Sequence, residues 1–216
     1  EWFMGINPRG LVPTIVHDGD VHIESNDIIE YVDANFPGQA LFPSDPEEAA
    51  FVQASMTEED DMHLSVRALT FRYMLPYEMM KKSDEAVDTM EAEGGDTVAG
   101  VVDGRKAIEV KFWRDMNANK GITDDQVIAA VKDFNGAFAK LDARLAAHEW
   151  LLASGFSALD ISWWITVFRV TKLGFPTENF PNLFAWYEKL LAREEFAREV
   201  GTPPEVIEMS MAHQAS

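Results

Sequence analysis

The chain opens with short apolar segments separated by turn residues, and then changes to a helical pattern that lasts to its end. Residues Leu11–Val16 predict a strand, and Asp20–Glu24, with Val21 and Ile23 on one face, predicts its partner. Asp18-Gly19 between them is a two-residue hairpin signal. Ser25-Asn26-Asp27 can then cap a helix whose apolar face is Ile28, Ile29 and Val32. The pattern therefore predicts a hairpin followed by a helix.

Two antiparallel strands and one helix are too few to bury a core of their own. We therefore interpret residues 1–37 as the C-terminal part of a small α/β domain. A β-α-β unit, which takes about 30 residues or more, is expected upstream of residue 1. Residues 38–46 are expected to be a linker, because Phe42-Pro43-Ser44-Asp45-Pro46 is stiff and polar.

Residues 47–216 are predicted to form an all-helical domain. A first helix is expected from Glu48 to about Leu75, where Pro76 would end it, and a second from Lys106 to Asn119. The stretch Ser83–Gly104 between them is acidic and is expected to be a loop or a lid. It contains four glycines, Gly94, Gly95, Gly100 and Gly104.

Three further helices have recognisable starts. Thr123-Asp124-Asp125-Gln126 is a capping box, and the apolar residues after it are three or four apart: Val127, Val131, Phe134, Phe138, Leu141 and Leu145. Ser157-Ala158-Leu159-Asp160 has the same polar frame. The helix that follows, Leu159–Val170, is apolar nearly all round and is expected to be the central buried helix. Pro181-Asn182 starts another, with Leu183, Trp186, Tyr187 and Leu190.

Composition narrows the class of protein. The 216 residues are 47% hydrophobic, as in a folded globular protein, and no apolar run reaches the roughly 20 residues of a membrane helix. No signal-peptide pattern follows Glu1, and there is no cysteine for disulfides or for a nucleophilic thiol. We therefore expect a cytoplasmic protein without a membrane partner. The net charge of −19 repels phosphate backbones, so nucleic acid is not an expected partner.

Other site chemistries find little support in the sequence. The five histidines, His17, His22, His63, His148 and His213, lack metal-ligand spacing, and each is expected to be solvated. The acidic run Glu58–Asp61 is interpreted as a solvated helix face. Gly94-Gly95 lies in an acidic stretch and does not form a phosphate-binding loop. No metal site is predicted.

Two groups of residues, far apart in the chain, resemble one family. Asn7-Pro8-Arg9-Gly10-Leu11-Val12-Pro13, the hairpin and Glu24-Ser25-Asn26-Asp27-Ile28 resemble the second half of a glutathione transferase N-terminal domain. Trp150-Leu151-Leu152 and Phe156–Ile161 resemble the core motif of that family's helical domain. Trp2-Phe3, Ile6–Gly10 and the insertion around 83–121 are similar to bacterial members, including the branch with the β-aryl etherases of lignin breakdown.

This resemblance to the glutathione S-transferase superfamily implies an α+β fold, with a partial thioredoxin-like domain before an all-helical domain. It also implies a homodimer that uses glutathione as co-substrate. Members stabilise the glutathione thiolate with a Ser, Tyr or Cys near the first strand, a position expected upstream of residue 1. No catalytic residue is therefore assigned in this chain.

The resemblance also implies a glutathione site. Val12-Pro13 would form a cis peptide bond that turns the Val12 backbone toward the ligand's cysteinyl amide. Ser25, at a helix N-terminus, would bind the γ-glutamyl carboxylate, and Glu24 would pair with the ligand ammonium. The alternatives are a trans proline on an edge strand, a serine that only caps the helix, and a solvated strand end.

The hydrophobic co-substrate is expected to bind between the domains. Candidate pocket residues are Met62, Arg67, Phe71 and Tyr73 on the first long helix, and Trp113. The alternative for the apolar candidates is ordinary core packing, which is commoner for methionine and aromatic side chains at helical spacing. Ser157 and Asp160 are interpreted as structural capping residues, with Asp160 buried as in the family.

The predicted function is that of a glutathione transferase. The glutathione thiolate would attack a small hydrophobic electrophile, by conjugation or by reductive cleavage of an ether or halide. The alternative is a non-catalytic binding or interaction module with the same fold.

Overall fold

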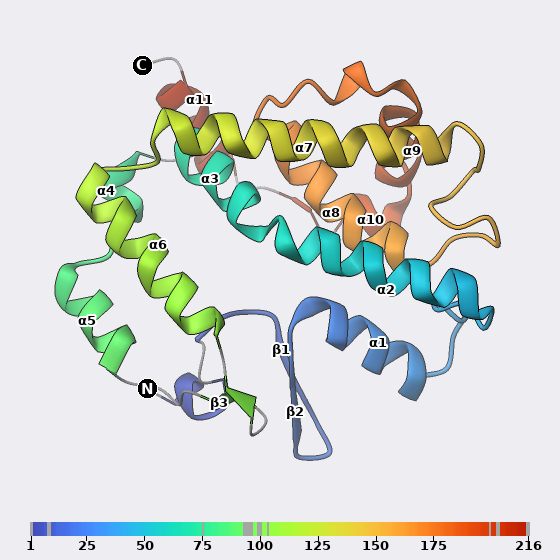
Figure 1. Ribbon diagram of the computed structural model, residues 1–216, viewed down its shortest axis with the longest axis horizontal. Helices are drawn as coiled ribbons and strands as arrows, with labels where there is room; N and C mark the ends of the chain where they lie inside the picture. Colours follow the sequence, from blue (N-terminus) through green and yellow to red (C-terminus); the bar gives the residue numbers. More distant parts are fainter. Residues whose placement is uncertain are drawn as a thin grey trace. The chain divides into compact units, whose positions relative to one another are not determined.

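The computed structural model describes residues 2–7, 10–74, 76–92, 97–98, 101–102, 104–198, 200–201 and 204–214. The contacts among its residues divide the chain into two units (Figure 1). Unit 1 is Glu1–Phe36 with Tyr77–Gly121, and unit 2 is Pro37–Pro76 with Ile122–Ser216. The first boundary between the two units, after Phe36, lies next to the domain boundary expected at residue 37. The region expected to be one helical domain over 47–216 is shared between the units, because residues 77–121 group with the hairpin.

Unit 1 combines a hairpin, a helix and a second helical segment. Its elements are a 3-10 turn at Phe3–Gly5, β1 (Thr14–His17), β2 (Asp20–Ile23), α1 (Ser25–Asn35), α4 (Tyr77–Met80), α5 (Asp84–Ala92), β3 (Thr97–Val98), β4 (Val101–Val102) and α6 (Arg105–Asn119). The predicted hairpin is confirmed, since β1 and β2 are antiparallel and Asp18 and Gly19 have φ of 51° and 93°. Positive φ at both positions is what a two-residue hairpin turn needs.

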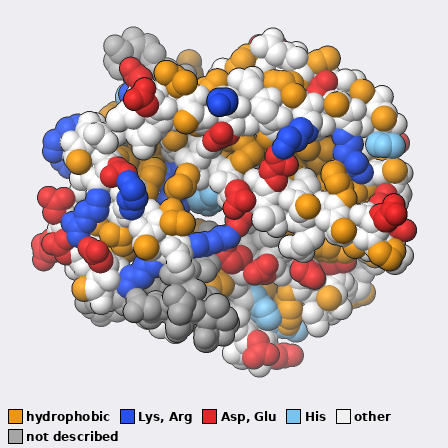
Figure 2. Space-filling model, viewed as in Figure 1, with side chains coloured by type: hydrophobic (Ala, Val, Ile, Leu, Met, Phe, Trp, Pro, Cys, Tyr) orange, Lys and Arg blue, Asp and Glu red, His pale blue; other side chains and the backbone are white. Residues whose placement is uncertain are grey.

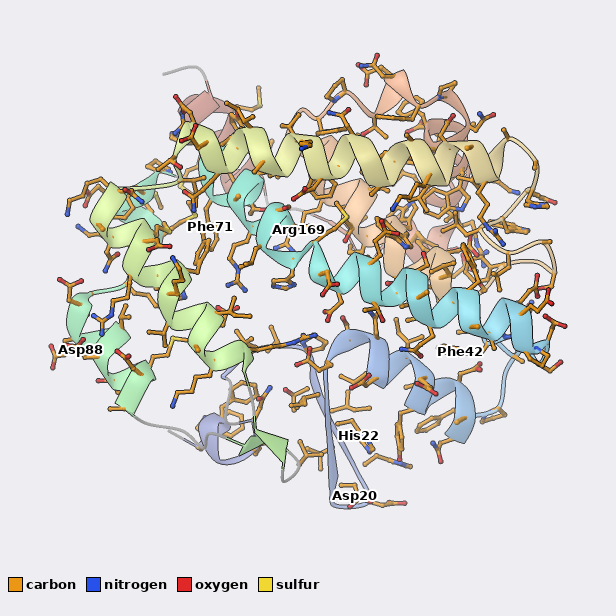
Figure 3. All side chains as sticks on the ribbon, viewed as in Figure 1. Asp20, His22, Phe42, Phe71, Asp88 and Arg169 are labelled. Carbon is orange, nitrogen blue, oxygen red and sulfur yellow. The ribbon has the colours of Figure 1, made fainter. Side chains whose placement is uncertain are left out.

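Aromatic and imidazole rings hold α1 against the hairpin. The His22 ring stacks on Tyr31 with centroids 3.6 Å apart, and His17 Nδ1 lies 2.6 Å from the Tyr31 hydroxyl. Figure 3 shows His22 on the side of the hairpin that faces α1, and Asp20 at its turn end. The expectation that every histidine is solvated is wrong for His17 and His22, which are half-buried. None of the residues of α1, all of which are described, is buried, so these flat rings supply much of the contact.

The prediction of a loop or a lid over Ser83–Gly104 is wrong in part, because Asp84–Ala92 form helix α5. Ser83 starts this helix, because its hydroxyl accepts a hydrogen bond from the Ala86 N–H at 3.1 Å. Val87 has no exposed surface and packs inside unit 1. Composition misled the prediction, since an acidic stretch with glycines can still form a helix when a neighbouring helix supplies cations. Gly94, Gly95 and Gly100 lie outside the described residues.

Helix α6 supplies such a cation. Arg114 donates hydrogen bonds to Asp88 at 2.6 Å and to Glu91 at 2.8 Å, both on α5. Figure 3 labels Asp88 on that helix. The helix predicted over Lys106–Asn119 is confirmed, and it ends where Lys120 takes a left-handed conformation before Gly121. The two helices therefore form one packed pair within unit 1.

Unit 2 is helical throughout its described elements. They are α2 (Pro46–Asp61), α3 (His63–Tyr73), α7 (Asp124–Leu145), α8 (Ala158–Lys172), a 3-10 turn at Thr177–Asn179, α9 (Pro181–Leu191), α10 (Glu194–Ala197) and α11 (Pro204–Gln214). The single helix predicted from Glu48 to about Leu75 is wrong, because the chain breaks at Met62. The break directly follows the acidic run Glu58–Asp61. Four carboxylates at a helix C-terminus oppose the helix dipole and favour an end there.

The core of unit 2 is built around α7, α8 and α9. The predicted capping box is present, with the Thr123 N–H donating to Gln126 Oε1 at 2.9 Å. Phe134 and Phe138 of α7 are fully buried, and both pack edge-on against Phe175. Helix α8 is the central buried helix, as predicted, and it packs on α2, α3 and α9. The four apolar positions predicted for α9 are all buried.

Asp160, in the first turn of α8, connects three parts of this core. It is fully buried, and its carboxylate accepts hydrogen bonds from the backbone N–H groups of Leu151, at 3.1 Å, and Ser157, at 2.9 Å. It also accepts from the Ser157 hydroxyl at 3.1 Å and from Trp186 Nε1 at 2.9 Å. Asp160 therefore caps its own helix, as predicted, and also fixes a loop and the neighbouring helix α9.

Burial makes this carboxyl a source of pH dependence. Removal from water is the largest cause of a pKa for Asp160 above its ordinary value of 3.8, and the four hydrogen bonds oppose it. The folded protein therefore holds the proton more tightly than the unfolded chain. Stability from this group is fully present below pH 3.8 and is lost as the pH rises through the folded-state pKa.

We expect this loss to be visible against Asp160→Asn, which cannot ionise. The free energy of unfolding of the wild type, minus that of the variant, should fall as the pH rises from about 4 to 7. Urea unfolding at each pH measures the difference, and all other titrating groups cancel between the two proteins. A difference that is constant or rises with pH would contradict the inferred effect of burial.

Candidate functional site

The hairpin brings the predicted glutathione residues to one end of unit 1. Thr14 of β1 pairs with Ile23 of β2, so the chain before Thr14 and the chain after Ile23 leave the sheet at the same end. Val12 and Pro13 precede Thr14, and Glu24 and Ser25 follow Ile23. The structure therefore brings these four residues together, although they are up to 13 positions apart in the sequence.

The Val12–Pro13 peptide bond is cis, as the family resemblance implies. Val12 is 80% exposed. Its backbone N–H and C=O make no hydrogen bond to any of the described residues. This backbone is therefore open to pair with an extended ligand.

Asn7 holds the loop that presents Val12. Its side chain is 2% exposed, and its Nδ2 donates to the Leu11 carbonyl at 2.8 Å and to the Thr14 hydroxyl at 3.0 Å. The sequence predicts no role for Asn7 beyond its place in the family motif. The signal that could have identified it is an amide side chain placed just before a loop that returns to a strand, where the loop's backbone groups need partners.

Glu24 has an unusual backbone conformation at the start of α1. Its φ is 69° and its ψ is 123°, a region that residues with a Cβ atom rarely adopt. Such conformations cost on the order of 1–3 kcal/mol and cluster at binding and active sites. The strain turns the chain sharply from β2 into α1. Glu24, rather than Ser25, is thereby the N-cap residue.

The N-terminus of α1 has no side-chain cap among the described residues. Ser25 is the first residue of the helix and is exposed, and its hydroxyl makes no hydrogen bond to the described part of the chain. The alternative in which Ser25 only caps the helix is therefore wrong. A helix start without a side-chain cap, together with a hydroxyl that makes no hydrogen bond to the described residues, is suited to binding a carboxylate.

Arg105, the first residue of α6, also reaches this junction. Its Nη1 donates to Glu24 Oε2 at 2.5 Å, with the two side chains 48% and 28% exposed. The residues are 81 positions apart, and both belong to unit 1. The alternative of a solvated strand end is therefore wrong for Glu24, whose carboxylate is half-buried in an ion pair.

The predicted pocket residues divide between the two units. Met62 is buried at the junction of α2 and α3 and packs into the core of unit 2. Arg67, Phe71 and Tyr73 lie on α3, where Arg67 Nη2 is 3.0 Å from His63 Nε2 and Tyr73 is 37% exposed. Trp113 lies on α6 in unit 1, with the Lys82 ammonium 4.8 Å from its ring centroid. The hydrophobic pocket stays a prediction.

Charge on the visible face of the molecule is dispersed. In Figure 2 acidic side chains are spread over the face rather than gathered in one patch. Among the described residues, no group of three or more His, Asp or Glu side chains is placed to hold a metal ion. None of the helices in the described ranges combines the length and the apolar composition that a bilayer crossing requires.

Two family profiles match the chain. The one described as "Glutathione S-transferase, N-terminal domain" matches residues 1–40, and "Glutathione S-transferase, C-terminal domain" matches 112–189. The junction of hairpin and α1 lies inside the first match, and Asp160 lies inside the second. Residues 41–111, which include α5 and Arg105, lie outside both.

Individual relatives extend over most of the chain. Protein LigF of Sphingobium sp. strain SYK-6 is 25% identical over 202 residues, covering 89% of this chain and 74% of LigF. The tetrachloro-p-hydroquinone reductive dehalogenase of Sphingobium chlorophenolicum is 23% identical over 197 residues, covering 90% and 76% of the two chains.

Solved structures share the fold. The crystal structure of β-etherase LigF superposes with a TM-score of 0.71 at 24% identity, covering 92% of this chain and 81% of that one. A theta class glutathione S-transferase from Xanthomonas axonopodis pv. citri, solved with glutathione bound, gives 0.64 at 24% identity, with coverage of 94% and 78%. The fold is a reduced thioredoxin-like part with two strands, followed by a helical domain, and the chain belongs to the glutathione S-transferase superfamily.

Proposed function

We propose that this protein is a glutathione transferase that binds glutathione at the junction of the hairpin and α1. The observation that carries the proposal is the uncapped N-terminus of α1, next to the strained Glu24 and beside the open backbone of Val12. Ser25 and the helix N–H groups bind the γ-glutamyl carboxylate, Glu24 pairs with the ammonium, and Val12 pairs with the cysteinyl amide. Pro13 fixes the turn that exposes Val12.

The nucleophile in the proposed reaction comes from glutathione. A free thiol has a pKa of about 8.5, so only a few per cent is thiolate at pH 7. The thiolate attacks an electrophilic carbon of a small hydrophobic substrate, and the leaving group departs with the bonding electrons. Conjugation, with an ether or halide as the leaving group, fits this scheme directly. Reductive cleavage needs a second glutathione, whose thiolate attacks the thioether sulfur, so that glutathione disulfide forms and the substrate carbon takes the electron pair and a proton. Relatives named as a β-etherase and a reductive dehalogenase support the second form.

The residue that stabilises the thiolate is not assigned to any position of the chain. Met62, Arg67, Phe71, Tyr73 and Trp113 stay candidates for the hydrophobic pocket, with the burial of Met62 favouring a core role for that side chain. A homodimer, implied by the resemblance, and a cytoplasmic location, expected from the composition, are part of the same proposal.

Ser25→Ala should weaken glutathione binding by about 1–3 kcal/mol, the usual effect of losing a hydrogen bond to a charged group. Isothermal titration of glutathione into the protein measures this change. Ser44→Ala is the control, because Ser44 is an exposed serine in the linker outside unit 1. Equal dissociation constants for wild type and Ser25→Ala would remove Ser25 from the site. No saturable binding by the folded wild type would favour the non-catalytic module.

A further inference from the structure

The N-terminus of α6 has a charge distribution that opposes its helix dipole. Arg105 and Lys106 are its first two residues, and its first turn has no acidic residue. The start of a helix carries a partial positive charge, so cations there are unfavourable unless an anion lies nearby. No side chain among the described residues caps this end. In a chain of net charge −19, this end of α6 is locally positive.

The Arg105 side chain connects this end of α6 to the start of α1. The Arg105–Glu24 hydrogen bond joins the N-terminus of α6 to that of α1, which also lacks a side-chain cap among the described residues. Both helices are longer than two turns, with 15 and 11 residues. The Arg105 guanidinium and the Glu24 carboxylate therefore present a positive and a negative group side by side at the start of α1.

The γ-glutamyl end of glutathione is an α-amino acid zwitterion, with an ammonium and a carboxylate on one carbon. Glu24 offers a negative partner for the first, and Arg105 offers a positive partner for the second. We propose that Arg105 is a specificity-determining residue that binds the γ-glutamyl α-carboxylate together with Ser25 and the N-terminus of α1. This inference rests on the proposed function.

Arg105 is suited to this role by its chemistry. A guanidinium has five N–H donors in a planar fork, a geometry that matches the two oxygens of a carboxylate. Its side chain is 48% exposed, which leaves it accessible to a ligand. Its ion pair with Glu24 orients it before the ligand arrives, which reduces the entropy lost on binding.

Two other roles would give different results. Arg105 could compete with the ligand ammonium for Glu24, in which case its removal would tighten binding. It could instead only hold α6 to the hairpin, in which case its removal would weaken every ligand equally. A ligand that lacks the α-carboxylate separates these roles from the proposed one. The probe is 4-aminobutyryl-cysteinylglycine, which is glutathione without that carboxylate.

The experiment is isothermal titration of glutathione and of 4-aminobutyryl-cysteinylglycine into the wild type, Arg105→Gln and Arg105→Lys. Arg114→Gln is the matched control, because Arg114 lies on the same helix and is ion-paired with Asp88 and Glu91. We expect Arg105→Gln to weaken glutathione binding about tenfold or more, as for a lost charge-assisted hydrogen bond. Its affinity for the truncated ligand should stay within about twofold of the wild type, since that ligand has no carboxylate for Arg105.

Arg105→Lys keeps the charge and should lose less glutathione affinity than Arg105→Gln. Arg114→Gln should bind both ligands as the wild type does. Equal weakening of the two ligands by Arg105→Gln, or tighter glutathione binding, would overturn the assignment while leaving the proposed function in place. A wild type that is folded by circular dichroism and binds no glutathione would overturn the proposed function, and this inference with it.

Discussion

Replacing Asp160 by alanine is expected to lower the free energy of unfolding by about 3–5 kcal/mol. The change leaves the Leu151 N–H, the Ser157 N–H and the Trp186 indole N–H without their acceptor in a buried site. Each unsatisfied buried donor costs about 1–3 kcal/mol. A loss of this size is a large part of the 5–15 kcal/mol that typically stabilises a folded protein. The expected loss exceeds the effect of an ordinary helix cap, because the carboxylate also fixes a loop and α9.

Urea unfolding followed by circular dichroism measures this effect. Asp61→Ala is the control, since Asp61 is an exposed aspartate at the end of α2 and its loss should change stability by less than about 0.5 kcal/mol. An Asp160→Ala protein as stable as the control would mean that the loop and α9 find other partners for these three donors.

Replacing Glu24 by glycine is expected to weaken glutathione binding and to relieve backbone strain at this position. Loss of the carboxylate should weaken glutathione binding about 10- to 100-fold, because a charge-assisted hydrogen bond to the ligand ammonium disappears. The φ of 69° is readily adopted by glycine, so the same variant loses backbone strain. Glu24→Ala lacks the carboxylate but keeps the strain, which makes it the matched comparison.

We expect Glu24→Gly to be more stable than Glu24→Ala by about 1 kcal/mol, the relief of strain less the extra entropy of glycine in the unfolded chain. Both should bind glutathione equally weakly. The control pair is Asp20→Gly and Asp20→Ala in β2, where the glycine variant should be the less stable one. If Glu24→Gly were less stable than Glu24→Ala, the inferred backbone strain at Glu24 would be contradicted. If either variant kept wild-type affinity, Glu24 would have no part in the binding site.

The sequence predicted those elements whose signals are local. The turn Asp18-Gly19, the capping box at Thr123 and the apolar spacing of α9 each fix a structure within a few residues, and all were confirmed. The predicted apolar face of α7 is buried from Phe134 onward, whereas Val131 is 36% exposed. Asp160 was recognised as a buried capping residue from its motif. Its bond to Trp186, however, depends on the packing of α9 against α8, and spacing alone does not determine that packing.

The failures share a different cause. Helix α5 was missed because its acidic residues are neutralised by Arg114 on α6, whose place beside them comes from tertiary structure. The break at Met62 was missed because apolar periodicity continues across it, whereas the acidic run before it opposes a continuous helix. Residues Glu24 and Ser25 were singled out from a motif, but Arg105 lies 81 positions away and has no sequence signal that connects it to them.

The discontinuity of unit 1 also constrains the order in which the protein folds during synthesis. The hairpin is synthesised before its partner segment in unit 1. That segment ends only at Gly121, after residues 37–76 of the other unit have been made. At 5–20 residues per second, the hairpin waits roughly 4–17 s for that segment. The Glu24–Arg105 bond closes a loop across this interval, so unit 1 and its ligand junction are completed late, and the nascent hairpin spends that time without its partner.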